Sequence, residues 1–124
     1  MAVRLLLVED NEVYRSSLEL LLGLREGFEV VGSVGAGDAA ADAAAELQPD
    51  VVVMDYRLPG IDGAAATRAV VASSGAAVVC LTAEATADER ERIVEAGAVA
   101  LVEKADSIES LAAAIRGAVE RPTQ

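Results

Sequence analysis

Short apolar runs alternate along this chain with longer segments of helical periodicity. The apolar runs are Val3–Val8, Phe28–Val34, Val51–Met54, Ala76–Leu81 and Ala98–Val102. They are rich in Val and Leu and do not alternate with polar residues, as is typical of strands buried on both faces of a sheet. Helices are predicted for Asn11–Leu24, Asp38–Leu47, Asp62–Ser73, Ala87–Ala96 and Ser107–Glu120. Five repeats of strand and helix indicate an α/β fold, a doubly wound five-stranded parallel sheet with right-handed crossovers.

Polar residues mark several of the predicted helix starts. Thr86 and Glu89 have the spacing of a capping box, and Asp106 and Glu109 offer the same spacing at the last helix. Asp38 is interpreted as an N-cap residue. The last helix is predicted to bury one face, formed by Ile108, Leu111, Ala112, Ile115 and Val119.

The length of 124 residues predicts a single domain, with residues 1–120 folded and 121–124 a flexible C-terminal tail. No apolar run reaches the roughly 20 residues needed to cross a bilayer, and the first ends at Glu9, so we expect a cytoplasmic protein without membrane contact. Cys80 is the only cysteine, and its apolar surroundings predict a buried thiol. A net charge of −11 argues against direct binding of nucleic acid by this domain.

Polar residues close four of the five predicted strands: Glu9 with Asp10, then Asp55, Thr82 and Lys104. The carboxyl ends of parallel strands meet at one edge of a sheet, where open α/β sheets place their sites. Three carboxylates brought together there must share protons or hold a cation. The chain has no His, so the ligands are oxygens, which favours Mg²⁺ or Mn²⁺ over zinc or copper.

The same residues suit the transfer of a phosphoryl group. Asp55 can serve as a metal ligand and as a nucleophile, because a carboxylate beside a metal forms acyl phosphates. Lys104 can pair with the incoming negative charge, and the Thr82 hydroxyl can donate a hydrogen bond to it.

Four segments resemble the receiver domain of two-component response regulators: Leu5–Asn11, Val51–Gly63, Leu81-Thr82-Ala83 and Val102-Glu103-Lys104. They match that family in order and spacing over nearly the whole chain. Arg15 and the sequence Lys104-Ala105-Asp106 look like the receivers of the NarL/LuxR-type subfamily. The resemblance implies a flavodoxin-like fold, with a receiver domain over residues 1–120.

By this resemblance the protein is a phosphorylation-dependent switch that catalyses only its own phosphorylation and dephosphorylation. Asp55 would accept a phosphoryl group from a sensor histidine kinase or a small acyl phosphate, and Thr82 and Lys104 would contact its oxygens. Mg²⁺ would be bound by Asp10, by Glu9 through water, by Asp55 and by the Arg57 backbone carbonyl. The implied partners are the sensor histidine kinase, an output domain or downstream protein in transcription regulation, and a second copy in a homodimer.

The sequence departs from the family's pattern at two positions. Leu101 stands where the family usually has Tyr or Phe as a switch residue, and we expect it to stay buried because burial of Leu is worth roughly 1.5–3 kcal/mol. Ala105 replaces a common Pro, so a trans peptide bond is expected there. The resemblance also places Arg57 and Glu84 opposite each other across the phosphoryl group.

Three alternatives remain open. Gly35-Ala36-Gly37-Asp38-Ala39-Ala40 fits a dinucleotide-binding fingerprint, although Asp38 would repel pyrophosphate and these 124 residues include no substrate domain. A haloacid-dehalogenase-like phosphatase would need a second Asp where Arg57 stands. The third is a receiver-like interaction module that works without phosphorylation.

Overall fold

The computed structural model describes residues 2–120, so the predicted tail at residues 121–124 lies outside the described residues. The strands are β1 (Val3–Val8), β2 (Phe28–Val34), β3 (Val51–Asp55), β4 (Ala77–Thr82) and β5 (Ala100–Glu103). The helices are α1 (Glu12–Gly23), α2 (Ala40–Leu47), α3 (Gly63–Ser73), α4 (Ala87–Ala96) and α5 (Ile108–Glu120), and a 3₁₀ helix, η1 (Gly37–Ala39), precedes α2. All five predicted strands and all five predicted helices are confirmed, with boundaries within two residues.

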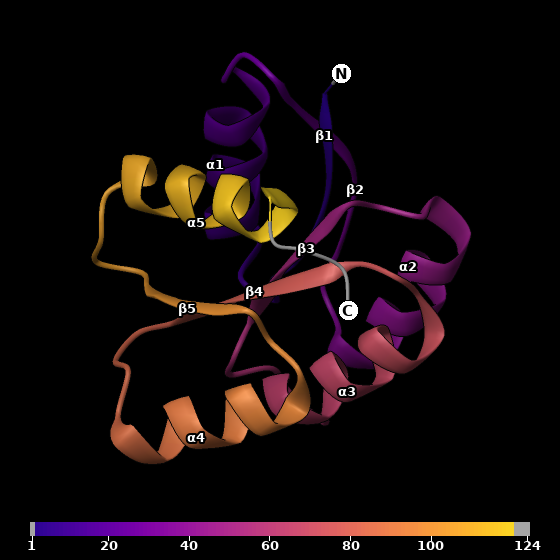
Figure 1. Cartoon of the computed structure of the whole chain (residues 1–124), viewed down its shortest axis with the longest axis vertical. Helices are drawn as coiled ribbons and strands as arrows, with labels where there is room; N and C mark the ends of the chain where they lie inside the picture. Colours follow the sequence, from indigo (N-terminus) through magenta and orange to yellow (C-terminus); the bar gives the residue numbers. More distant parts are fainter. Residues whose placement is uncertain (1, 121–124) are drawn as a thin grey trace.

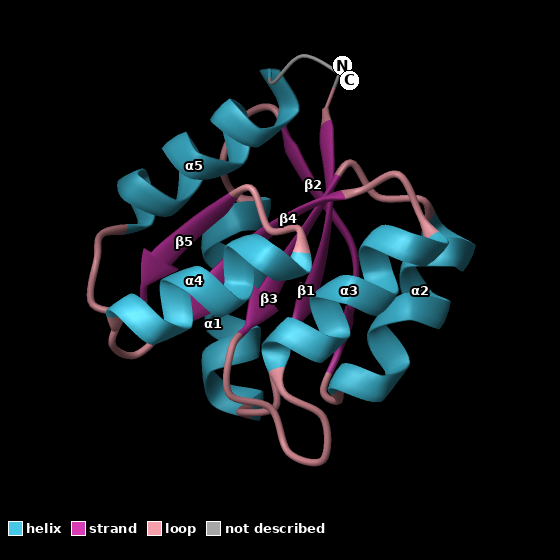
Figure 2. Cartoon of the chain, turned by 60° about the horizontal axis from the view of Figure 1, so that its bottom comes forward, coloured by secondary structure: helices cyan, strands magenta, loops and turns pink. Residues whose placement is uncertain are grey.

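The five strands form one parallel sheet in the order β2-β1-β3-β4-β5. Helices cover both faces, with α1 and α5 on one side and α2, α3 and α4 on the other (Figures 1 and 2). This is the doubly wound, flavodoxin-like fold that the alternation of elements predicts. Because β1 has β2 on one side and β3 on the other, the strand order reverses between β1 and β3, where such sheets open a crevice at their carboxyl ends.

Each face of the sheet has its own apolar core. On one face, Leu6, Val52 and Cys80 pack with residues of α2, α3 and α4, including Ile93. On the other, Leu7 and further residues of the central strands pack with Leu18, Leu22, Leu111 and Ile115 of α1 and α5. Successive side chains of a strand point to opposite faces, so strands covered twice need continuous apolar runs. Cys80 is fully buried, as predicted.

Several details of the helix ends differ from the predictions. At α5 the Ser107 hydroxyl, and not Asp106, accepts a hydrogen bond from a first-turn amide, that of Ser110 (3.2 Å). The Asp106 carboxylate turns back to the amide of Glu103 (3.3 Å). Leu111, Ala112 and Ile115 of α5 are buried as predicted, but in the last turn Ala118 is buried and Val119 is 45% exposed.

The start of α2 was also predicted wrongly. Asp38 lies inside η1 and is not the N-cap residue of an α-helix; α2 begins at Ala40 without a side-chain cap. The neighbouring Gly37 is buried against the loop that follows β3. A Cβ placed on it would lie 2.7 Å from Ile61 Cγ2 and 3.0 Å from Leu58 Cδ1, so the packing leaves no room for a side chain. The glycine of the apparent dinucleotide fingerprint therefore allows close packing of the chain and does not open space for pyrophosphate.

The start of α3 fixes the loop after β3. Asp62 caps this helix, accepting a hydrogen bond from the Ala65 amide (2.8 Å). Gly63 donates its amide hydrogen to the Tyr56 carbonyl (2.7 Å), and a Cβ on Gly63 would lie 2.5 Å from Tyr56 Cα. Only a residue without a side chain allows the backbones to approach this closely. Across residues 2–120, no helix has the length and apolar character required to cross a membrane.

Candidate functional site

The five polar side chains predicted for the site lie at the carboxyl edge of the sheet, and Arg57, predicted to contribute its carbonyl, follows β3 in the same region. Glu9 and Asp10 follow β1, Asp55 ends β3, Thr82 ends β4, and Lys104 follows β5. The Lys104 amide donates to the Thr82 carbonyl (2.7 Å), which ties the loop after β5 to the end of β4. The site thus occupies the end of the central strands, where the strand order reverses.

Three carboxylates converge as the sequence predicts. Glu9, Asp10 and Asp55 each offer an oxygen, and these atoms lie within 4.8 Å of one another. Glu9 and Asp55 are buried at 1% and 3% exposure, whereas Asp10 is exposed. A set of oxygen ligands with one open side suits a hard divalent cation that keeps part of its water shell.

Lys104 balances part of this negative charge. Its Nζ atom donates to Glu9 Oε1 at 3.0 Å and lies 3.4 Å from Asp55 Oδ2. It also sits over the Tyr14 ring, 4.7 Å from the centroid, at a distance suited to a cation–π contact. Partial burial acts to lower the pKa of Lys104, but the hydrogen bond to Glu9 and the charge of Asp55 outweigh it and raise this pKa.

The electrostatics of Asp55 reflect the crowding of acids. Burial, and next the Glu9 carboxylate, raise the pKa of Asp55 to about 6, although Lys104 and the hydrogen bond from the Arg57 amide act in the opposite direction. The lysine therefore compensates the buried carboxylates only in part. A divalent cation placed among them would supply the missing positive charge.

The loop between β1 and α1 is fixed by its own side chains. The Asn11 amide donates to Glu9 Oε2 (3.0 Å), and the Asn11 side chain caps α1 by accepting from the Tyr14 amide (2.9 Å). The Arg15 guanidinium donates to the Glu9 carbonyl (2.7 Å) and passes close to Gly35, whose absent Cβ would lie 2.9 Å from it. Glu9 is thereby held on both its backbone and its carboxylate.

Arg57 does not form an ion pair with Glu84, the residue that the resemblance places opposite it across the phosphoryl group. Its guanidinium forms an ion pair with Glu89 of α4 (2.8 Å). The predicted capping box is formed only by half: Thr86 Oγ1 accepts from the Glu89 amide (3.1 Å), but the Glu89 carboxylate turns inward instead of returning to the Thr86 amide. That carboxylate accepts the Thr82 hydroxyl (2.8 Å).

Comparison with known proteins identifies the family of this chain. A family model for the response regulator receiver domain matches residues 5–116. The chain belongs to this family. The response regulator domain of Thermotoga maritima CheB superposes on this receiver with a TM-score of 0.91, at 25% identity, covering 99% of this chain and 100% of that one.

Other receivers extend this comparison. The receiver domain of the sensor histidine kinase PA1611 from Pseudomonas aeruginosa, solved with a magnesium ion coordinated in its active site cleft, is 30% identical with a TM-score of 0.85, covering 98% of this chain and 100% of that one. The transcriptional regulatory protein PdtaR of Mycobacterium tuberculosis is 39% identical over 118 residues, 95% of this chain and 57% of that protein. The response regulator GacA of Pseudomonas aeruginosa is 34% identical over 115 residues, 92% and 54% respectively. The chain spans a little over half the length of these curated relatives.

The structure describes both positions at which the sequence departs from the family pattern. Leu101 is half-buried and packs against the core that includes Ile93 of α4. The peptide bond between Lys104 and Ala105 is trans, as expected, since no cis bond occurs within residues 2–120.

The sequence analysis did not predict two residues that contact the site residues, Glu89 and Tyr14. Glu89 was assigned to a helix cap, and only its spacing from Thr86 set it apart from other acids of α4. Tyr14 carries no motif of its own, but it lies three residues after the N-cap Asn11, on the side of α1 that faces Lys104.

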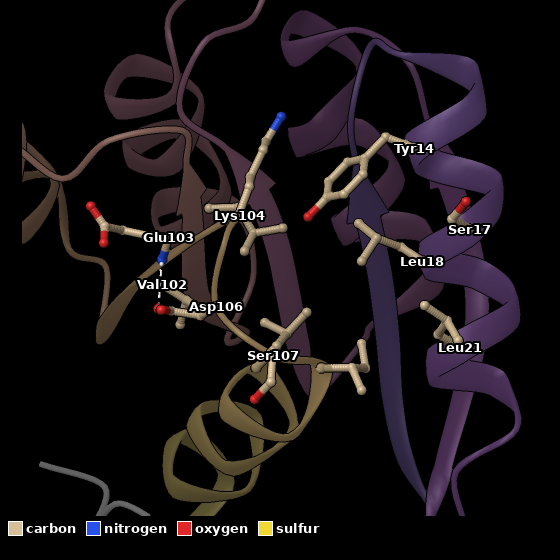
Figure 3. A pocket seen from close by; sticks show the side chains of 12 residues that line it. Tyr14, Ser17, Leu18, Leu21, Val102, Glu103, Lys104, Asp106 and Ser107 are labelled. Atoms are coloured by element: carbon tan, nitrogen blue, oxygen red, sulfur yellow. Dashed lines mark hydrogen bonds between the residues drawn. The ribbon is translucent and has the colours of Figure 1, made fainter.

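A cavity of about 130 Å³ adjoins the site between α1, β5 and α5 (Figure 3). Leu18 and Leu21 of α1 line one side of it, and Tyr14 and Lys104 line it as well. The Lys104 ammonium also contacts Glu9 and Asp55. Lys104 therefore has acids on one side and this small cavity on the other.

Proposed function

We propose that this receiver accepts a phosphoryl group on Asp55 from a phosphohistidine of a sensor kinase, in the presence of Mg²⁺. The observation that carries the proposal is the meeting of Asp55 with Glu9, Asp10 and Lys104 at one edge of the sheet. Two of these carboxylates are buried, and burying charges that are only partly paired is costly. A bound cation would offset this cost by neutralising the carboxylates, and the site would then be ready to accept a phosphoryl group.

In the transfer, an Asp55 carboxylate oxygen attacks the phosphorus atom. An O–P bond forms, the P–N bond to the donor imidazole breaks, and the departing nitrogen takes the bonding electron pair. The hydrogen bond from the Arg57 amide to Asp55 Oδ1 (3.2 Å) and the nearby Lys104 ammonium orient the nucleophile. A pKa of about 6 leaves Asp55 mostly ionised, and so nucleophilic, above neutral pH.

The oxygen ligands fit a magnesium ion. Asp10 and Asp55 would bind it directly, Glu9 through a water molecule, and the Arg57 carbonyl would complete the protein ligands; Mn²⁺ suits the same donors. When bound, the cation would neutralise charge that develops on the phosphoryl oxygens. Lys104 would pair with one of these oxygens, and the Thr82 hydroxyl would donate to another.

The proposed role is regulatory. Residues 1–120 would act as the receiver module, catalyse only their own phosphorylation and dephosphorylation, and control an output domain or a downstream protein. PdtaR and GacA are named as regulators, which supports such an output for a chain that matches about half of each. Pairing with a second copy belongs to the same proposal.

Incubation with acetyl phosphate and Mg²⁺ tests the acceptor. Intact mass should rise by one phosphoryl group, and Asp55→Asn should abolish the gain. The matched control is Asp38→Asn, the same change at an exposed acid of η1. Modification of Asp55→Asn at the parental rate would refute the assignment, and a parent that is never modified would favour an interaction module that works without phosphorylation.

A further inference from the structure

Glu89 is a buried acid on a helix whose other acids are exposed. It lies in the first turn of α4 with its side chain 8% exposed, and it points toward the site instead of the solvent. Its carboxylate accepts hydrogen bonds from Thr82 Oγ1 and from Arg57 Nη2, both at 2.8 Å. Both donors flank the proposed acceptor, since Arg57 lies two residues after Asp55 and Thr82 ends the neighbouring strand.

The hydroxyl of Thr82 has a single proton to donate. Thr82 is completely buried, and its nearest acceptor is the Glu89 carboxylate; the Glu84 carbonyl is farther, at 3.2 Å. Hydrogen bonds to carboxylates are stronger than those to neutral carbonyls, so the Thr82 hydroxyl donates its hydrogen bond to Glu89. The donor that a phosphoryl group on Asp55 needs is therefore already engaged.

We propose that Glu89 holds the unphosphorylated state by occupying the Thr82 hydroxyl, and that a phosphoryl group on Asp55 displaces it. The inference rests on the proposed function, because it requires a phosphoryl group at Asp55. The phosphoryl group brings a charge of about −1.5 to −2 and three acceptor oxygens. It competes with the Glu89 carboxylate for the same donor and repels it.

The exchange links the site to α4. Glu89 belongs to the first turn of this helix, and its amide is bound to Thr86 Oγ1 (3.1 Å), so an outward movement of the carboxylate shifts that turn. Once released, the carboxylate lies near the N-terminus of α4, where the helix dipole favours a negative charge. The Arg57 side chain is 66% exposed, so it has room to stay paired with the Glu89 carboxylate or to turn toward the phosphorylated Asp55. Ile93 and Ala96 remain buried and keep the rest of α4 in place.

The test measures how tightly the protein binds beryllofluoride, a phosphoryl mimic, in the presence of Mg²⁺. Glu89→Gln keeps the shape of the side chain and removes its charge, so the mimic should bind roughly tenfold more tightly, which is the scale of one charge-assisted hydrogen bond. Amide hydrogen exchange in residues 87–90 should be faster in unmodified Glu89→Gln than in the parent. Acetyl phosphate should also modify this variant faster.

Glu91→Gln is the matched control, because it removes the same charge from the exposed side of the same helix. It should bind the mimic like the parent. With Thr82→Val as background, Glu89→Gln should tighten binding clearly less than it does in the parent, since competition for the hydroxyl is gone and only the charge repulsion remains. If Glu89→Gln does not fold, Glu89→Asp, which shortens the side chain by one methylene, should tighten binding in the same direction.

A purely structural role for Glu89 gives a different result. Glu89→Gln would then lower the melting temperature while mimic affinity stayed equal to that of the parent or fell, and either affinity result overturns the inference. If the parent itself neither binds beryllofluoride nor reacts with acetyl phosphate, the proposed function fails first. If the parent does both and Glu89→Gln matches it, only the inference about Glu89 fails.

Discussion

Replacing Asp55 with Asn should stabilise the metal-free protein at neutral pH. The substitution removes one negative charge from a buried cluster whose only close cation, within residues 2–120, is Lys104. Lys104 keeps its contact with Glu9 at 3.0 Å, so the variant leaves the lysine with a partner. Asn has nearly the shape of the protonated Asp and leaves the packing unchanged.

The pKa of Asp55 sets the size of this effect. Folding raises this pKa from 3.8 to about 6, and two pKa units correspond to about 3 kcal/mol. Because the folded state holds the proton more tightly, the stabilisation is complete below pH 3.8 and is lost as the pH rises through 6. Allowing for the lost contact with Lys104, we expect Asp55→Asn to gain about 1–3 kcal/mol at pH 8. The gain should shrink toward zero near pH 4.

Urea or thermal unfolding in EDTA at pH 4, 6 and 8 measures this directly. A gain of this size raises the melting temperature by roughly 3–10 °C for a domain of this length. Asp42→Asn, the same substitution at an exposed acid of α2, should give a small and pH-independent change. A parent that is more stable than Asp55→Asn at pH 8, or a difference that does not vary with pH, would contradict the electrostatic reasoning.

Three further predictions concern single residues. Mg²⁺ should raise the melting temperature of the parent, and Asp10→Asn should reduce that rise while slightly stabilising the metal-free protein, as calorimetry with and without Mg²⁺ would show. Leu101 should keep its rotamer when a phosphoryl mimic binds, while Thr82 moves toward the mimic; structures of both states would check this, and an exposed Leu101 that becomes buried would disprove it. Gly63→Ala should cost about 1–3 kcal/mol of stability in urea unfolding, because the new Cβ would collide with the Tyr56 backbone; wild-type stability would show that the loop yields easily.

The sequence predicted the sheet well because its strands are covered on both faces. Continuous apolar runs such as Val51–Met54 are typical of such strands, and the polar residues at the ends of four of the five runs mark the candidate site. The convergence of Glu9, Asp10, Asp55 and Lys104 was predicted because the carboxyl ends of parallel strands meet at one edge of a sheet.

Side-chain partners were harder to predict, since several were within reach of the same residue. Arg57 could extend to Glu84 or to Glu89, and the choice depends on the position of α4 over the sheet, which no local pattern encodes. The capping residue of α5 was predicted wrongly for a related reason: Ser107 and Asp106 are both good N-cap residues. Only the path of the chain after β5 decides between them.

The burial of Cys80 gives this protein an internal reporter of global opening. The thiol lies at full burial in β4, between two neighbouring strands, and burial, reinforced by the Asp55 and Glu89 charges, raises its pKa far above the ordinary value. Reagents attack the thiolate, so they find no target while the sheet is closed. Labelling must wait until β4 separates from its neighbours, and its rate then follows the population of molecules open at the centre. Binding at the carboxyl edge of the sheet should therefore slow the labelling of Cys80 by a thiol reagent, with no need to introduce another cysteine.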